Sequence, residues 1–175
     1  MQFKVPYYEY RRIGNKIFKI MKVFILSKPQ FDSLMRTNNL NDSTVESRDS
    51  VFIISIVDTD QFSASREPHF KENHENVLNL AFDDCEHDGQ PSPTQPEGTQ
   101  AFSESQAKEL FEFIEKHRNK EQCIVHCMAG ISRSGAVGTF INGYGQGDWG
   151  DFKRINPQIS PNERVHRMLN EAKYN

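Results

Sequence analysis

A cysteine and an arginine, six positions apart, form the pattern in this sequence that is best suited to chemistry. Cys127 ends a short apolar run, and Arg133 opens a segment whose apolar residues have helical spacing. This order predicts a β-strand, a tight loop and the start of a helix. The first N–H groups of a helix lack partners within it, so such a loop binds anions. We expect a thiol placed there to ionise easily and to attack phosphorus.

The residues around this pair fit a loop that holds a phosphate group. Arg133 offers a planar fork for two phosphate oxygens, which lysine does not match in geometry. Gly130 allows the backbone to turn where a side chain would obstruct it. The predicted phosphate-binding residues are Met128, Ala129, Gly130, Ile131, Ser132 and Arg133. The plainer alternative, a buried and inert thiol on a core strand, does not explain why these residues occur together.

Two adjacent aspartates supply a candidate proton donor. Asp83 and Asp84 directly follow a predicted strand over residues 77–82. The carboxyl ends of parallel strands meet at one edge of a sheet, so these side chains and the Cys127 loop can share that edge. A carboxylic acid there could protonate the leaving oxygen of a phosphate ester. The alternative is that both aspartates only cap the loop in which they lie.

The segment from His126-Cys127 to Arg133-Ser134 resembles the H-C-x-x-x-x-x-R signature of the protein tyrosine phosphatase superfamily. Its Ala-Gly-Ile-Ser-Arg-Ser form is most similar to the compact dual-specificity branch. The resemblance extends from about Val23 to Leu169. It implies a metal-independent reaction through a phosphocysteine, with no cofactor and with a phosphorylated protein or peptide as substrate.

The resemblance also implies a role for individual residues. It places the general acid at Asp84, with Asp83 as the alternative. Ser134 matches a hydroxyl that hydrogen-bonds the departing thiolate. His126 matches a residue that orders the loop and lowers the thiol pKa. Asn162 resembles an asparagine that braces the loop in many dual-specificity members.

Strands and helices alternate along the predicted chain. Strands are expected over 21–26, 51–57 and 77–82, and in the run that ends at Cys127. This order predicts an α/β fold with one domain. Its central, mostly parallel sheet would be flanked by helices on both faces, with the phosphatase P-loop between a strand and a helix. The run over 51–57 is apolar throughout, which is typical of a strand buried on both faces.

Local signals set the expected helix starts. Ser27 and Ser103 each stand three residues before a glutamine, which is the spacing of a capping box. Ser160 is expected to cap the last helix, with Pro161 in its first position. A further short helix is expected within residues 58–76.

Length and charge limit the class of protein. The chain has 175 residues and a net charge of −3, which argues against general nucleic-acid binding. We divide it into an N-terminal extension or edge strand (1–20) and a phosphatase domain (21–175). Residues 1–28 are basic, with seven Lys or Arg against one Glu. A solvated pair of terminal strands explains this better than a membrane or nucleic-acid patch.

Apolar runs and cysteines bear on the compartment. No apolar run approaches the roughly 20 residues that a membrane span needs. Three cysteines do not make a disulfide framework, and a thiolate nucleophile needs reducing conditions, so a cytoplasmic location is predicted. A reversible disulfide between Cys85 and Cys127 is a further hypothesis. The six histidines show no spacing typical of a metal site, and none is expected.

The predicted function is hydrolysis of phosphotyrosine, with phosphoserine and phosphothreonine as further substrates. A phosphoinositide or RNA 5′-phosphate phosphatase is one alternative, although the loop lacks the basic residues expected for a highly anionic head group. A phosphate-binding module without turnover is another. The oligomeric state is left open.

Overall fold

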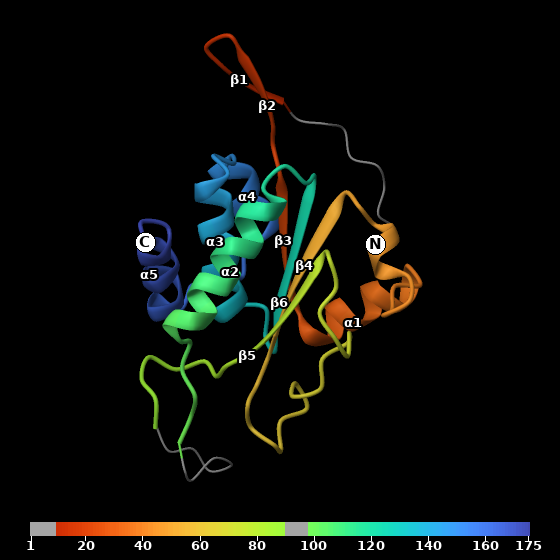
Figure 1. Cartoon of the computed structure of the whole chain (residues 1–175), viewed down its shortest axis with the longest axis vertical. Coiled ribbons are helices and arrows are strands. Elements are labelled where there is room, and N and C mark those ends of the chain that lie inside the picture. The colour runs from red at the N-terminus through yellow and green to blue at the C-terminus, as the bar shows by residue number, and fades with distance from the viewer. Residues whose placement is uncertain (1–9, 90–97) are drawn as a thin grey trace.

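The computed structural model describes residues 10–89 and 98–175 (Figure 1). The strands are β1 (Tyr10–Ile13), β2 (Lys16–Lys19), β3 (Lys22–Ser27), β4 (Val51–Val57), β5 (Val77–Ala81) and β6 (Gln122–Cys127). The helices are α1 (Lys28–Thr37), the 3-10 turn η1 (Val45–Ser47), α2 (Glu104–His117), α3 (Arg133–Tyr144), α4 (Trp149–Ile155) and α5 (Glu163–Ala172).

Four parallel strands form the central sheet in the order β3-β6-β4-β5. The predicted α/β fold with a central parallel sheet is therefore confirmed. In the register of this sheet, Cys127 lies beside Ser27 and His126 lies beside Ser55. The ends of β3, β4 and β6 thus meet at one edge, which we call the carboxyl edge, and the loop after Cys127 starts there.

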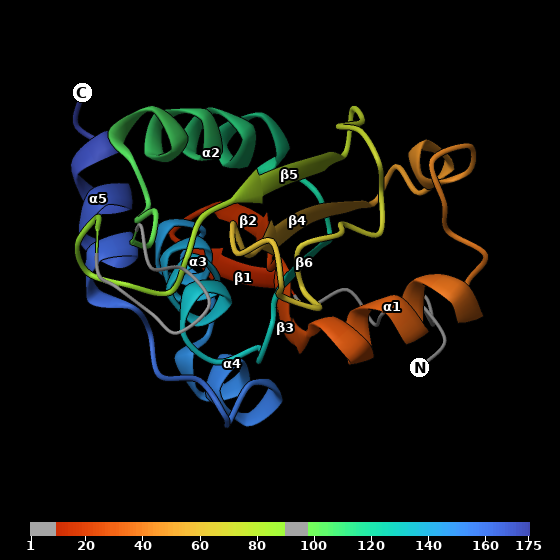
Figure 2. The same ribbon diagram turned by 90° about the horizontal axis from the view of Figure 1, so that it is seen from below.

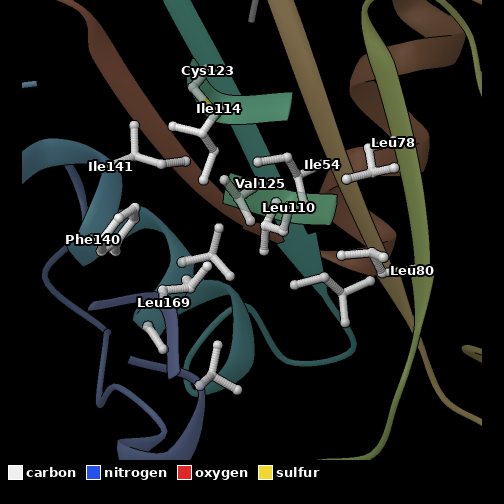
Figure 3. Close-up of a cluster of buried hydrophobic side chains, with 14 of the residues drawn as sticks. Ile54, Leu78, Leu80, Leu110, Ile114, Cys123, Val125, Phe140, Ile141 and Leu169 are labelled. Atoms are coloured by element: carbon white, nitrogen blue, oxygen red, sulfur yellow. The ribbon is translucent and has the colours of Figure 1, made fainter. Parts of the chain in front are cut away.

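Helices cover both faces of the sheet, as predicted (Figure 2). Every residue of β4 is buried, and its side chains alternate between two apolar clusters. Ile53 packs with Phe31 of α1 on one face. Ile54 packs on the other face with Leu110 of α2 and Leu169 of α5 (Figure 3). The helices of the second face include α3, whose first residue is Arg133.

The outer edge of β3 is paired by side chains instead of another strand. Asn156 accepts a hydrogen bond from the backbone N–H of Ile25 at 2.8 Å and donates to the carbonyl of Val23 at 2.9 Å. Gln158 donates to the carbonyl of Ile25 at 3.1 Å. These bonds satisfy backbone groups that an edge strand leaves open, and they hold residues 156–158 against the sheet.

Three of the expected helix starts can be compared with the structure. Ser27 and Ser103 both form the predicted capping boxes. The expected cap at Ser160 is wrong, because α5 begins two residues later, with Asn162 as its N-cap. The Asn162 side chain accepts from the N–H of Val165 at 3.0 Å, and asparagine is as good an N-cap as serine.

The short helix expected within residues 58–76 is also wrong. The structure describes all of these residues and places only turns and an isolated bridge among them. Side chains here bond the nearby backbone: Asp60 accepts from the N–H of Phe62 at 2.8 Å, and Ser63 accepts from the N–H of Ser65 at 3.1 Å. Such bonds compete with the helical pattern.

The described part of the N-terminal extension forms a hairpin. β1 and β2 pair antiparallel in a separate two-stranded sheet, with Tyr10 opposite Lys19. Residues 1–9 lie outside the described part of the chain. Among the helices that the structure describes, none is long and apolar enough to cross a membrane.

Candidate active site

The loop between β6 and α3 occupies the carboxyl edge of the sheet. Gly130 has a φ of +69°, a conformation that favours glycine. A Cβ atom built on it would lie 2.5 Å from the carbonyl carbon of Leu26 and 2.5 Å from the nitrogen of Ser27. The loop can therefore lie directly on the junction of β3 and α1 only with glycine at this position.

Cys127 and Ser134 face each other inside the loop. Both residues are buried, and Cys127 Sγ lies 3.0 Å from Ser134 Oγ. Cys127 is the last residue of β6, and Ser134 lies in the first turn of α3. The thiol therefore sits at the N-terminal end of a helix, where the dipole of the helix favours negative charge.

His126 is buried behind the loop. Its Nε2 lies 2.8 Å from Ser55 Oγ, and its ring stacks on Phe31 with 4.0 Å between the ring centroids. Burial lowers the pKa of His126 to about 3, so its imidazole is neutral at neutral pH. It therefore orders the end of β6 by packing and hydrogen bonding, and adds no positive charge beside the thiol.

Arg133 is buried at the start of α3, with only part of its guanidinium paired. Its Nη2 lies 2.6 Å from Asp58 Oδ1, and its Nη1 donates to the carbonyl of Phe82 at 2.7 Å. Its Nε is buried and has no hydrogen-bond partner. An unpaired buried donor costs free energy, so this arginine is prepared to bind an acceptor that enters the loop.

Residues before α5 brace the loop from outside. Gln158 donates to the carbonyl of Gly130 at 3.2 Å. The backbone N–H of Ser160 donates to the carbonyl of Ile131 at 3.1 Å. The N–H of Asn162 donates to the carbonyl of Ser132 at 3.1 Å. In a trans peptide the N–H points away from the C=O, so these three bonds turn the N–H groups of residues 131–133 to the other side of the loop.

Asp84 lies over this loop. Its Oδ1 accepts from Ser132 Oγ at 2.7 Å and from Asn162 Nδ2 at 2.9 Å. Asp84 is exposed to solvent. Asn162, predicted as a brace, thus caps α5 with its oxygen and holds Asp84 with its nitrogen.

Asp83 has a different environment from its neighbour. It is buried, and its two carboxylate oxygens accept from the backbone N–H of Thr59 at 2.9 Å, from the N–H of Gln100 at 2.8 Å and from the hydroxyl of Thr59. The structure therefore separates the two aspartates into a loop anchor, Asp83, and an exposed group beside the loop that follows Cys127, Asp84.

Sequence reasoning missed Asp58 and Thr59. Both directly follow β4, whose end meets those of β3 and β6 at the carboxyl edge. The rule that pointed to Asp83 and Asp84 applies to them as well. The signal is present at both residues, but the polar composition of residues 58–76 predicts only a connection with a short helix.

The three cysteines, Cys85, Cys123 and Cys127, are free thiols and are all buried. Burial raises the pKa of Cys85 and that of Cys123, which keeps both protonated at neutral pH. Neither therefore has the ready thiolate that makes a cysteine reactive.

Three side chains of the types that bind metal ions lie close together, away from the loop that follows Cys127. Ligand atoms of Asp42, Glu72 and His74 lie within 4.8 Å of one another. His74 Nε2 lies 2.9 Å from Asp42 Oδ1, and this hydrogen bond lowers the pKa of Asp42. The backbone of His74 pairs with Val77, the first residue of β5, so the group lies at the opposite end of the sheet from Cys127.

Comparisons with known proteins add little to this geometry. No protein-family model matches the sequence, and no curated protein matches it. Among solved structures, the chain is similar to the crystal structure of Tk-PTP in the active form, with a TM-score of 0.41 and 19% sequence identity over 90% of each chain.

Proposed function

We propose that this protein is a cysteine-based phosphatase that hydrolyses phosphate monoesters on protein side chains. One observation carries the proposal: a buried thiol and a buried guanidinium stand at the two ends of one glycine-dependent loop at a helix start, and the buried Arg133 Nε lacks a partner. The loop N–H groups and this arginine suit the oxygens of a phosphoryl group.

In the first step the Cys127 thiolate attacks phosphorus. A sulfur–phosphorus bond forms while the bond between phosphorus and the leaving oxygen breaks. Arg133 and the loop N–H groups stabilise the charge on the phosphoryl oxygens. Asp84 donates a proton to the leaving oxygen, and its place beside Ser132 supports this role.

In the second step water hydrolyses the phosphocysteine. Asp84 takes a proton from the water, whose oxygen bonds to phosphorus as the sulfur–phosphorus bond breaks. Cys127 leaves as a thiolate, and the hydroxyl of Ser134, 3.0 Å away, donates a hydrogen bond to it. The residues of this cycle return to their starting states, and no step requires a metal or cofactor.

The surface of the loop supports a protein substrate over a highly anionic one. Met128 and Ile131 are large apolar residues that are exposed, at 42% and 38%. An apolar rim suits the ring or aliphatic part of a phosphorylated side chain. A phosphoinositide head group would call for basic residues at these positions.

Hydrolysis of p-nitrophenyl phosphate by the purified full chain tests the proposal. We expect turnover that persists in EDTA and falls at least about a thousandfold in Cys127→Ser. Cys123→Ala removes another buried thiol from the same strand and is expected to retain activity. Wild-type protein that binds inorganic phosphate without turnover would instead identify a binding module.

Phosphopeptides then define the substrate class. Rates on peptides of one sequence that carry phosphotyrosine, phosphoserine or phosphothreonine separate a tyrosine phosphatase from a dual-specificity enzyme. We expect phosphotyrosine to be the best of the three, because its ring reaches the apolar rim. Faster hydrolysis of a phosphoinositide or of an RNA 5′-phosphate would overturn the assignment to protein substrates.

A further inference from the structure

Two consecutive residues after β4 bond to opposite halves of the candidate active site. Asp58 lies 2.6 Å from the guanidinium of Arg133. Thr59 donates to Asp83 twice, through its backbone N–H at 2.9 Å and through its hydroxyl. The loop after β4 therefore connects the phosphate-binding arginine to the segment that carries the proton donor.

Asp83 also organises the segment around it. Its backbone N–H donates to the carbonyl of Gln100 at 2.7 Å, and its side chain accepts from the N–H of Gln100 at 2.8 Å. Further along, Gly89 donates to the carbonyl of Thr99 at 2.9 Å. Residues 83–89 are thus paired with residues 98–101. Thr59 links this paired segment, which we call the acid segment, to the central sheet.

The position of Asp84 depends on that link. Asp84 is exposed, and its Oδ1 accepts from Ser132 and Asn162. Its backbone is joined directly to the buried Asp83, so a displacement of Asp83 moves Asp84. An exposed carboxyl group held at one oxygen has little else to define its position over the loop, and proton transfer is sensitive to small displacements.

We infer that Thr59 is a positioning residue. It acts through Asp83 to hold the Asp84 carboxyl group where it can protonate the leaving group. This inference rests on the proposed phosphatase function. It predicts a defect in proton donation, which is measured by kcat/KM because kcat/KM covers only the steps up to release of the leaving group. Asp58, one position earlier, acts on Arg133 and therefore on phosphate binding.

Two substrates separate these effects. p-Nitrophenolate leaves readily and needs little protonation, whereas the phenolate of phenyl phosphate is a poor leaving group and needs the general acid. Thr59→Val keeps the shape of the side chain and the backbone N–H but removes the hydroxyl. We expect kcat/KM on phenyl phosphate to fall about tenfold, part of the 10² to 10⁴ that general acid catalysis supplies. On p-nitrophenyl phosphate kcat/KM should stay within about twofold.

Further variants separate the effect of losing the Thr59 hydroxyl from a general disturbance of the structure. Thr59→Ser restores the hydroxyl and should recover kcat/KM on phenyl phosphate. Ser63→Ala removes the hydroxyl that donates to Asp58, the partner of Arg133. It should therefore lower kcat/KM on both substrates alike. If Thr59→Val proves unfolded by circular dichroism, Asp83→Asn breaks the same bond from its other end and should show the same selective loss.

The outcomes separate this inference from the proposed function. An equal fall in kcat/KM on both substrates in a folded Thr59→Val protein, or no fall on either, would overturn the positioning role. A failure of the wild-type protein to hydrolyse either substrate would instead overturn the phosphatase proposal.

Discussion

The two halves of the candidate active site are built in different ways. The half with the nucleophile is one short stretch, His126 to Ser134, in which the side chains of His126, Cys127, Arg133 and Ser134 are buried. The half with the proton donor is assembled from distant segments: Asp84 is exposed, and it is bonded by Ser132 and Asn162, 48 and 78 positions away in sequence.

This difference fits the chemistry that we propose for each half. A phosphoryl group is bound most strongly by buried, preorganised donors, which Arg133 supplies. A residue that gives up a proton and later takes one from water must be accessible to water, and Asp84 is exposed to solvent. Substitutions in the buried half should therefore affect every substrate. Those in the exposed half should depend on the leaving group and on pH.

The largest effect is expected in the buried half, at Arg133. Arg133→Lys loses the fork that bonds Asp58, the carbonyl of Phe82 and the substrate together. We expect kcat/KM to fall about a thousandfold, or about 4 kcal/mol, on p-nitrophenyl phosphate and phenyl phosphate alike. Arg167→Lys, on the exposed side of α5, is the matched control and should change neither. A fall of less than tenfold in kcat/KM would show that a single positive charge at this position is sufficient for the reaction.

A smaller and selective effect is expected in the exposed half. Asp84→Asn cannot donate the proton, so kcat/KM on phenyl phosphate should fall about a hundredfold, and the alkaline limb of the profile of kcat/KM against pH should disappear. Asp83→Asn should keep that limb, because it shifts the position of Asp84 but does not remove its carboxyl group. If the limb disappears in Asp83→Asn and persists in Asp84→Asn, the two roles are reversed.

The smallest effect concerns stability in the buried half. Burial lowers the pKa of His126 from 6.5 to about 3, so between these values the unfolded chain binds a proton that the folded chain does not. The stabilisation that neutral His126 provides is complete above pH 6.5 and is lost as the pH falls toward 3. Between pH 6.5 and 5 the free energy of unfolding should drop by about 2 kcal/mol from this group.

Urea unfolding at the two pH values measures this contribution. His126→Gln has no titrating ring, so its free energy of unfolding should fall by about 2 kcal/mol less than that of the wild type over the same interval. Equal pH dependence in the two proteins would show that other groups cause the acid destabilisation.

Local patterns in the sequence predicted most of the fold. The apolar run over 51–57 predicted the buried strand β4, and the capping boxes at Ser27 and Ser103 predicted the starts of α1 and α2. These features depend on residues within a few positions of each other. The errors, at Ser160 and within residues 58–76, arose where several nearby side chains could cap or turn the backbone equally well.

The sequence by itself determined which residues stand in the buried half, because a strand, a glycine loop and a helix start bring Cys127, Arg133 and Ser134 together through adjacent chain. Only the tertiary structure decided the exposed half. Asp83 and Asp84 are chemically identical and adjacent, and they differ because Thr59 and Gln100 bond one of them while Ser132 and Asn162 bond the other. Those contacts join segments far apart in the chain, which no local pattern encodes.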